Sequence, residues 1–162
     1  MILVVESRWT IGFFDADVPY IIISITENSE EFAKIPKRRN CKGILQLKFS
    51  DVEEDIGDDI IEKYKLTLFN ENHARQILNF IFENKDNVNT IVCQCDAGIS
   101  RSSATAKALD KILNNDGIKT EYDFNLINSE FDILPFFPNG LVYRTIIQEY
   151  IKILQEKSNQ QS

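Results

Sequence analysis

The sequence predicts a single α/β domain with three layers, in which helices flank a central, largely parallel sheet of four to five strands. Three observations support this prediction. Short apolar runs typical of strands alternate along the chain with helical patterns. The length of 162 residues fits one domain, and the composition, 43% hydrophobic and 27% charged, is that of an ordinary globular protein. We expect the domain to span residues 1–157 and a polar tail to follow at 158–162.

Four segments have the pattern of β-strands. Ile2–Val5 and Tyr20–Ile25 are short continuous apolar runs, which is typical of strands that are buried on both faces. Ile44–Phe49 alternates instead, so it predicts a strand with one buried face. Asn89–Cys95 provides the next strand and leads directly into the most informative part of the chain.

Three segments have apolar side chains at helical spacing. The first covers residues 70–83, with Asn70 as a candidate N-cap. The second covers residues 102–113, and the third runs from about residue 141 to residue 157. Strands that alternate with helices favour a parallel sheet, in which ligands bind at the carboxyl ends of the strands.

Charge and cysteine content limit the possible partners and the compartment. The net charge of −7 argues against nucleic acid or an anionic membrane as the main partner. The apolar runs are too short to cross a bilayer, and the first residues lack the pattern of a signal peptide. Three cysteines, an odd number, then favour reduced thiols and a cytoplasmic location.

Residues 93–103 carry the strongest functional signal. Cys95 stands six positions before Arg101, Gly98 lies between them, and Ser102 follows the arginine. A strand, a tight loop and a helix start form a nest of backbone N–H groups that binds phosphate. We expect the backbone of this loop to bind the substrate through Asp96, Ala97, Gly98, Ile99 and Ser100.

A cysteine at the floor of such a nest predicts phosphoryl transfer. The helix N-terminus, the loop N–H groups and the guanidinium of Arg101 all favour the nucleophilic thiolate of Cys95. Arg101 can also hold two phosphoryl oxygens at once, and Ser102 can stabilise the departing thiolate. The alternative is that Cys95 is a buried core thiol and Arg101 an exposed helix residue.

The segment Cys95–Ser102 resembles the signature loop, Cys-x5-Arg-Ser/Thr, of the protein tyrosine and dual-specificity phosphatase superfamily. It is most similar to the compact bacterial and phage members, and the order of elements fits from about Tyr20 to Tyr150. The resemblance implies a phosphotyrosine phosphatase-like fold, a cysteinyl-phosphate intermediate, no metal or other cofactor, and an aspartic acid upstream that acts as general acid. The family usually has histidine immediately before the nucleophile, where it helps to order the loop and tune the thiol, and here this position is Gln94.

The acidic segment after the third strand contains the candidates for the general acid. Asp51 follows the strand Ile44–Phe49 closely, at the position that the resemblance implies, and Asp55 is the second choice. The alternative is that this segment is simply a solvated acidic face.

The sequence leaves the substrate open. A phosphorylated protein or peptide is the expected partner, with phosphotyrosine first and phosphoserine or phosphothreonine next. The alternatives are a phosphate-binding module with weak or no turnover, and a phosphatase for a phosphoinositide or another non-protein phosphate. The basic cluster Lys34–Lys42 is either a solvated loop or a secondary anion site, and the oligomeric state is not specified.

Overall fold

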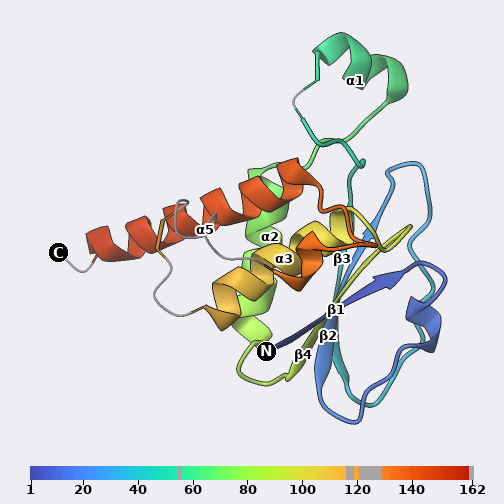
Figure 1. The fold of residues 1–162 in the computed structure, drawn as a ribbon, viewed down its shortest axis with the longest axis vertical. Coiled ribbons are helices and arrows are strands. Elements are labelled where there is room, and N and C mark those ends of the chain that lie inside the picture. Colours follow the sequence, from blue (N-terminus) through green and yellow to red (C-terminus); the bar gives the residue numbers. More distant parts are fainter. Residues whose placement is uncertain (55, 116–118, 121–128, 161–162) are drawn as a thin grey trace.

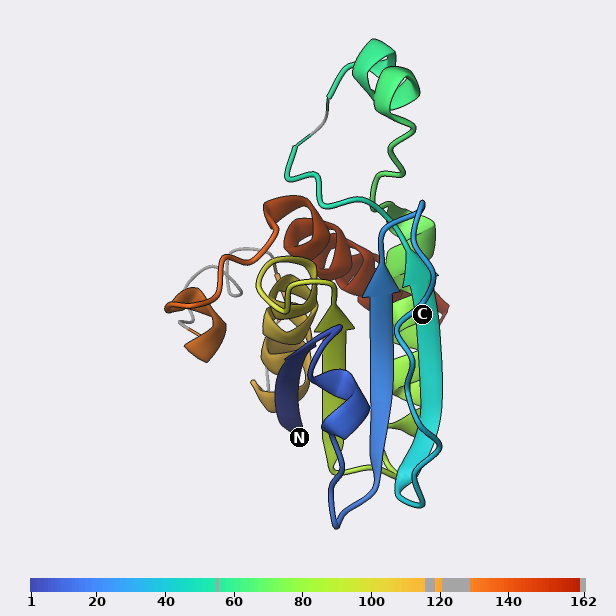
Figure 2. The same cartoon turned by 90° about the vertical axis from the view of Figure 1, so that its right-hand side faces the viewer.

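The computed structural model describes residues 1–54, 56–115, 119–120 and 129–160. Within these residues the strands, labelled in Figure 1, form one parallel sheet in the order β1-β4-β2-β3, which Figure 2 shows from the side. The strands are β1 (Ile2–Ser7), β2 (Tyr20–Thr26), β3 (Cys41–Lys48) and β4 (Thr90–Cys95). The predicted α/β class and the parallel sheet are confirmed, whereas the division into a domain and a short tail stays a prediction.

The register of the sheet places the end of β4 next to β1 and β2. Ser7 in β1 pairs with Cys95, and Ser24 in β2 pairs with Gln94. Because all the strands run in the same direction, their carboxyl ends meet at one edge of the sheet. The residues that follow β1, β2, β3 and β4 are therefore brought together at this edge.

Both faces of the central strands are covered. The helices α2 (Glu71–Asn84), α3 (Arg101–Asn114) and α5 (Gly140–Gln160) lie against one face (Figure 2). Ile22 and Val92 face the other side, where they pack against Ile11 of the short 3-10 helix η1 (Ile11–Phe13) and Ala33 of the segment between β2 and β3. Burial on both faces explains why β2 and β4 are apolar without alternation.

The helix α2 begins where the sequence indicates. The Asn70 side chain accepts hydrogen bonds from the backbone N–H groups of Asn72 and His73, and the His73 ring accepts one from the Asn70 N–H. This arrangement satisfies the donors at the helix start. The buried positions Ala74, Ile77, Leu78 and Ile81 then form the apolar stripe of the helix.

Besides η1, two further short elements are not predicted from the sequence. The helix α1 (Asp58–Tyr64) has no buried residue and projects from the body of the protein between β3 and α2 (Figure 1). The 3-10 helix η2 (Glu130–Asp132) is a single turn capped by Ser129. Neither buries an apolar stripe, so hydrophobic periodicity cannot reveal them. The final helix is longer than expected and ends at Gln160, and no described helix is both long and apolar enough to span a membrane.

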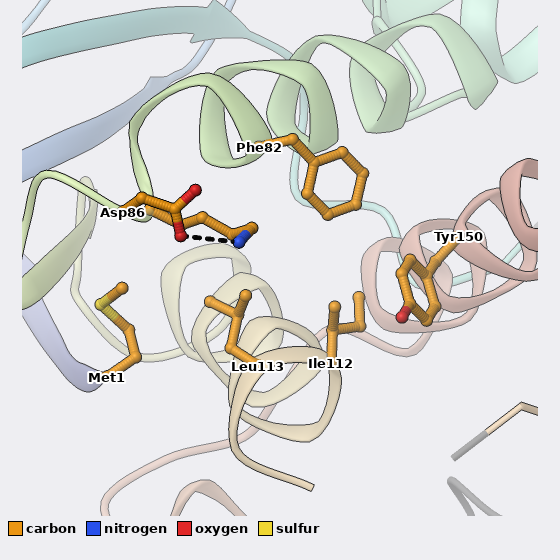
Figure 3. A pocket seen from close by; sticks show the side chains of 7 residues that line it. Met1, Phe82, Asp86, Ile112, Leu113 and Tyr150 are labelled. Atoms are coloured by element: carbon orange, nitrogen blue, oxygen red, sulfur yellow. Dashed lines mark hydrogen bonds and ion pairs between the residues drawn. The ribbon is translucent and has the colours of Figure 1, made fainter. Parts of the chain in front are cut away.

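A cavity of about 360 Å³ lies between the helices near the N-terminus of the chain (Figure 3). Aliphatic and aromatic side chains form most of its wall, and the ion pair between Lys85 and Asp86, with an N–O distance of 2.8 Å, lies at its rim. The wall consists of Met1, Phe82, Lys85, Asp86, Ile112, Leu113 and Tyr150. Met1 precedes β1, so this cavity lies toward the amino ends of the strands, away from Cys95.

We expect packing of α2, and not of α1, to determine the stability of the fold. Replacing the fully buried Ile77 with Ala should lower the free energy of unfolding by about 2–5 kcal/mol, because it leaves a cavity under the helix. The matched change Ile60→Ala in α1 should cost less than about 0.5 kcal/mol, since Ile60 is exposed. Urea unfolding followed by circular dichroism would measure both values, and equal losses would contradict the prediction.

Candidate active site

The loop between β4 and α3 turns on Gly98. This residue has a φ of +71°, in the left-handed region that favours glycine. A Cβ at this position would lie 2.9 Å from the backbone nitrogen of Ser7 and 3.0 Å from the carbonyl carbon of Glu6. The loop can therefore pack against the end of β1 only because residue 98 has no side chain. Its N–H donates to the Cys95 sulfur over 3.3 Å.

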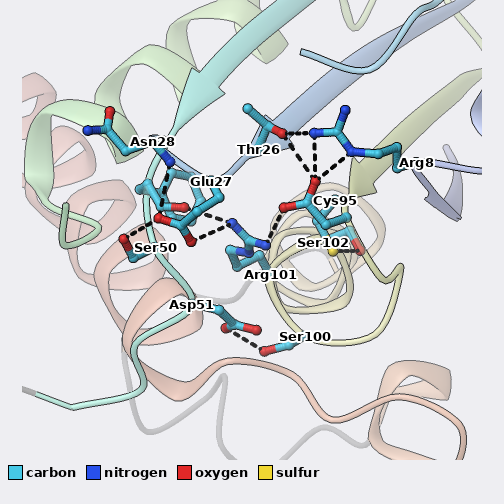
Figure 4. Close-up of polar contacts among 12 residues, drawn as sticks. Arg8, Thr26, Glu27, Asn28, Ser50, Asp51, Cys95, Ser100, Arg101 and Ser102 are labelled. Carbon is cyan, nitrogen blue, oxygen red and sulfur yellow. Dashed lines mark hydrogen bonds and ion pairs between the residues drawn. The ribbon is translucent and has the colours of Figure 1, made fainter. Parts of the chain in front are cut away.

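Cys95 is the last residue of β4, at the base of the loop that leads to α3. Its Sγ is 3.0 Å from the Ser102 Oγ (Figure 4), and both residues are buried. The sulfur thus has two polar neighbours, of which the Gly98 N–H is a fixed donor. Cys93 differs, because it is fully buried in the core, and burial, followed by the proximity of Cys95, raises the pKa of its thiol. Cys93 is a core thiol.

Arg101 is buried at the first position of α3, with only 6% of its surface exposed. Its Nη1 donates to the Phe49 carbonyl and its Nη2 to Asp96 Oδ2, both over 2.8 Å. A carboxylate oxygen of Glu27 lies 3.8 Å from Nη1. The alternative that Arg101 is an exposed helix residue is wrong.

One donor of this guanidinium is left over. The Nε of Arg101 is buried and has no hydrogen-bond partner among the described residues. An unpaired buried donor lowers stability, so such groups need an explanation. An unpaired guanidinium N–H at the start of a helix is a place where an anionic oxygen would be stabilised.

Asp96 links Arg101 to the strand ends. Its Oδ1 accepts from Arg8 Nε over 2.9 Å and from Thr26 Oγ1 over 3.1 Å, while its Oδ2 accepts from Arg101 Nη2 over 2.8 Å. Burial acts to raise the pKa of Asp96, but the hydrogen bonds from Arg8, Arg101 and Thr26 outweigh it and hold this pKa below its ordinary value. Asp96 is therefore a carboxylate at neutral pH.

Asp51 reaches the same loop from the segment after β3. Its Oδ1 accepts hydrogen bonds from Ser100 Oγ over 2.8 Å and from Asn139 Nδ2 over 2.7 Å. Asn139 is buried, and it also donates to the Val52 carbonyl and accepts from the Val142 N–H at the start of α5. The structure thus brings Asp51 into contact with the loop that holds Cys95, whereas Asp55 lies outside the described residues.

The rest of the loop is fixed through its backbone. The carbonyl groups of Ile99 and Ser100 accept from the N–H groups of Phe137 and Asn139, which precede α5. Ala97 carries only a methyl group, and the Ile99 side chain is partly exposed, so neither contributes a polar side chain. The segment before α5 therefore holds the far side of the loop.

The basic cluster Lys34–Lys42 lies elsewhere. Lys37, Arg38 and Lys42 line a cavity of about 220 Å³ that also includes Cys41 and Gly43. Cys41 is the first residue of β3, so this cavity is at the amino ends of the strands, opposite the edge with Cys95. A secondary anion site there remains a hypothesis.

Comparison with solved structures identifies the fold. The human tyrosine phosphatase-like serine/threonine/tyrosine-interacting protein is 19% identical, covers 94% of this chain and 93% of its own, and gives a TM-score of 0.54. A mouse dual-specificity phosphatase complexed with zinc tungstate is 17% identical, with 96% and 86% covered and a TM-score of 0.55. PTPMT1 in complex with PI(5)P is 15% identical, with 96% and 91% covered and a TM-score of 0.50.

The chain has the dual-specificity phosphatase fold. No protein-family model matches it, and no curated sequence matches it. The fold that the resemblance of Cys95–Ser102 implies is confirmed.

Several residues of the site are not evident from the sequence. Arg8, Thr26 and Glu27 directly follow or end strands, and only the parallel register shows that they meet Asp96 and Arg101. Asn139 has the signal of a helix N-cap, since it precedes α5, but nothing in the sequence connects it to Asp51. Position at a strand end is the one signal that could have identified the first three.

Gln94 is the residue immediately before Cys95 in this dual-specificity phosphatase fold. Its side chain is fully buried, its Oε1 accepts from Ser24 Oγ over 2.6 Å, and its Nε2 donates to the Cys95 carbonyl over 2.8 Å. The Gln94 side chain therefore connects the start of the loop to β2 through hydrogen bonds. A hydrogen-bonding side chain is retained here although the residue is not histidine.

We expect Gln94 to stabilise the loop through these two bonds. Gln94→Leu should lower the free energy of unfolding by about 1–3 kcal/mol, because the Ser24 hydroxyl and the Cys95 carbonyl lose their buried partner. In a Ser24→Ala background the same change should cost less, since one of these groups is then absent. Thermal unfolding of Gln94→Leu, Ser24→Ala and the double variant measures how much stability Gln94→Leu removes in each background. Equal losses in both backgrounds would disprove the hydrogen bond between Gln94 and Ser24.

Proposed function

We propose that this protein is a phosphomonoester hydrolase, a protein tyrosine or dual-specificity phosphatase that acts through a cysteinyl-phosphate intermediate. One observation carries the proposal: Cys95 and the buried Arg101, with its unpaired Nε, lie at the two ends of one loop at a helix start. The dual-specificity phosphatase fold supports it. A nucleophile beside an anion site is the arrangement that phosphoryl transfer needs.

In the first step the Cys95 thiolate attacks phosphorus. A sulfur–phosphorus bond forms, the bond from phosphorus to the ester oxygen breaks, and the leaving oxygen takes a proton from Asp51. The Gly98 N–H and the start of α3 favour the thiolate before the attack. Arg101 and the loop N–H groups of residues 96–101 stabilise the equatorial oxygens in the transition state.

In the second step water hydrolyses the intermediate. Asp51 takes a proton from the water, the oxygen–phosphorus bond forms, and the sulfur–phosphorus bond breaks to return Cys95 as a thiolate. The Ser102 hydroxyl, 3.0 Å from the sulfur, can donate to it as the charge develops. Inorganic phosphate is the product, and Asp51 is again protonated for the next cycle.

The charges of the site favour a substrate with a single phosphate. Asp96 lies in the loop, and Glu27 lies 3.8 Å from Arg101, so two carboxylates border the anion site. Arg8 and Arg101 only balance these two carboxylates, so no excess positive charge remains to bind a lipid headgroup with further phosphates. This supports a phosphorylated protein or peptide over a phosphoinositide, although PTPMT1, which shares the fold, was crystallised with PI(5)P.

The competing proposal is a phosphate-binding module without turnover. The contacts of Asp51 with Ser100 and Asn139 favour an enzyme, because they hold a carboxyl group at the rim of the loop. The close pair of Cys95 and Ser102 favours it as well. Stable binding of a phosphopeptide by the unmodified protein without release of phosphate would instead favour the binding module.

Cys95→Ser tests the nucleophile. We expect it to abolish hydrolysis of p-nitrophenyl phosphate, since the serine hydroxyl is not ionised at neutral pH, whereas binding of tungstate to the loop should persist. Release of p-nitrophenol and calorimetric titration with tungstate measure the two properties. Hydrolysis at the unmodified rate by the variant would rule out the mechanism.

Asp51→Asn tests the general acid. Asparagine keeps the oxygen that accepts from Ser100 and Asn139 but has no proton to give. We expect kcat to fall by about 10²–10³ for phosphotyrosine, a poor leaving group, and by much less for an activated aryl phosphate.

Asp55→Asn provides the matched control for this assignment. It removes a neighbouring carboxyl group from the same acidic segment and should leave both rates within about threefold of the unmodified protein. If Asp55→Asn causes the large loss for phosphotyrosine and Asp51→Asn does not, the assignment moves to Asp55.

A further inference from the structure

We propose that Arg8 is a positioning residue that keeps Arg101 available to the substrate phosphate by holding the carboxylate of Asp96. The inference rests on the proposed function, because it concerns how Arg101 binds an anion. Arg8 lies immediately after β1, outside the loop, and follows Ser7, the residue that pairs with Cys95. It does not contact the Cys95 sulfur in any described interaction.

The residue after the nucleophile creates an electrostatic problem. Asp96 is an anion, its side chain is 30% exposed, and it lies in a loop whose proposed ligand is also an anion. It also binds the guanidinium that should hold this ligand. Carboxylate and arginine prefer a bidentate pair with two parallel hydrogen bonds. Such a pair would consume the Arg101 donors on which phosphate binding depends.

Arg8 prevents this bidentate pairing. Its Nε and Nη2 both lie 2.9 Å from Asp96 Oδ1, and Thr26 Oγ1 donates to the same oxygen over 3.1 Å. Only Oδ2 remains for Arg101, which it binds through Nη2 alone. This arrangement is consistent with the Arg101 Nε that has no partner in the described structure.

The Arg8 side chain is itself held from several directions. Its Nη2 contacts Thr26 Oγ1 and donates to the Glu31 carbonyl over 2.8 Å, and its backbone N–H donates to the Asp96 carbonyl over 3.1 Å. The side chain is 23% exposed, so solvent screens its charge only in part. Arg8 thus fixes both the backbone and the side chain of Asp96.

The balance of charge supports the same role. Arg101 faces two carboxylates, from Asp96 at 2.8 Å and from Glu27 at 3.8 Å. Without Arg8, one guanidinium would stand against these two carboxylates, and this cluster would repel a phosphate dianion. With Arg8 the four charges cancel, so an anion can approach Arg101.

Arg8→Met tests the proposal. We expect the Kd for tungstate, measured by calorimetry, and the KM for p-nitrophenyl phosphate to rise about tenfold, which is the effect of one charge near a partly buried anion. The kcat should stay within about threefold, since Arg8 touches neither the nucleophile nor the general acid. Arg8→Lys retains the charge and should keep the Kd within about threefold of the unmodified protein.

A double-mutant cycle with Asp96→Asn tests whether Arg8 affects tungstate binding through the Asp96 carboxylate. If Arg8 acts through the Asp96 carboxylate, Arg8→Met should change the tungstate Kd less than twofold in the Asp96→Asn background. An equal tenfold effect in both backgrounds would overturn the proposal, and so would an Arg8→Lys variant as weak as Arg8→Met.

Arg75→Met is the matched control for loss of an ion pair. Arg75 binds Glu149 and Glu156 between α2 and α5, away from the loop. Arg75→Met should lower the melting temperature and leave the tungstate Kd unchanged.

If the unmodified protein binds no tungstate and hydrolyses no phosphate ester, the proposed function fails, and the role of Arg8 fails with it. If the unmodified protein binds tungstate and Arg8→Met binds it equally well, only the role of Arg8 is wrong.

Discussion

The close packing of Gly98 against the end of β1 is the contact on which the site depends. The loop passes so near the backbone of Glu6 and Ser7 that a Cβ on residue 98 would lie 2.9 Å from the Ser7 nitrogen. This approach lets Cys95 and Arg101 stand at the two ends of a tight turn, with the Gly98 N–H directed at the sulfur. It also brings Arg8, which follows β1, to Asp96. A wider turn would separate Cys95 from Arg101, the two groups proposed to contact the same phosphate.

A second constraint is electrostatic, because the protein as a whole has a net charge of −7 while its candidate site must attract an anion. The site meets this constraint locally, because the N-terminus of α3, the backbone N–H groups of the loop between β4 and α3, and the side chains of Arg8 and Arg101 place positive charge around one loop. Its two partly exposed carboxylates each accept hydrogen bonds: Asp96 from Arg8 and Thr26, and Glu27 from the Ser50 hydroxyl over 2.6 Å. Acidic side chains near an anion site are thereby compensated before a substrate arrives.

The sequence predicts the parts of this structure that depend on local patterns. The apolar runs of β2 and β4, the Asn70 cap and the spacing of Cys95, Gly98 and Arg101 are all local signals, and each is found where it was expected. Arg8, Glu27 and Asn139 were missed, since their partners lie 88, 74 and 88 positions away along the chain. Such contacts follow from the order β1-β4-β2-β3, which periodicity does not determine. The helix α1 was missed for a different reason, because it buries nothing and so leaves no apolar pattern.

Two of the candidate catalytic residues, Arg101 and Asp51, differ in how they are held, and the difference suits their proposed roles. Arg101 is buried and bonded to the backbone of Phe49 and to the side chain of Asp96, so its position is fixed by the core. Asp51 is exposed, and its described bonds come from two polar side chains, those of Ser100 and Asn139. Exposed polar contacts exchange with water at little net cost, whereas buried charged contacts do not. A fixed arginine suits the constant geometry of a phosphoryl group, and an exposed acid suits leaving groups that differ from one substrate to the next. The same segment connects them, because the Phe49 carbonyl that holds Arg101 is only two residues before Asp51.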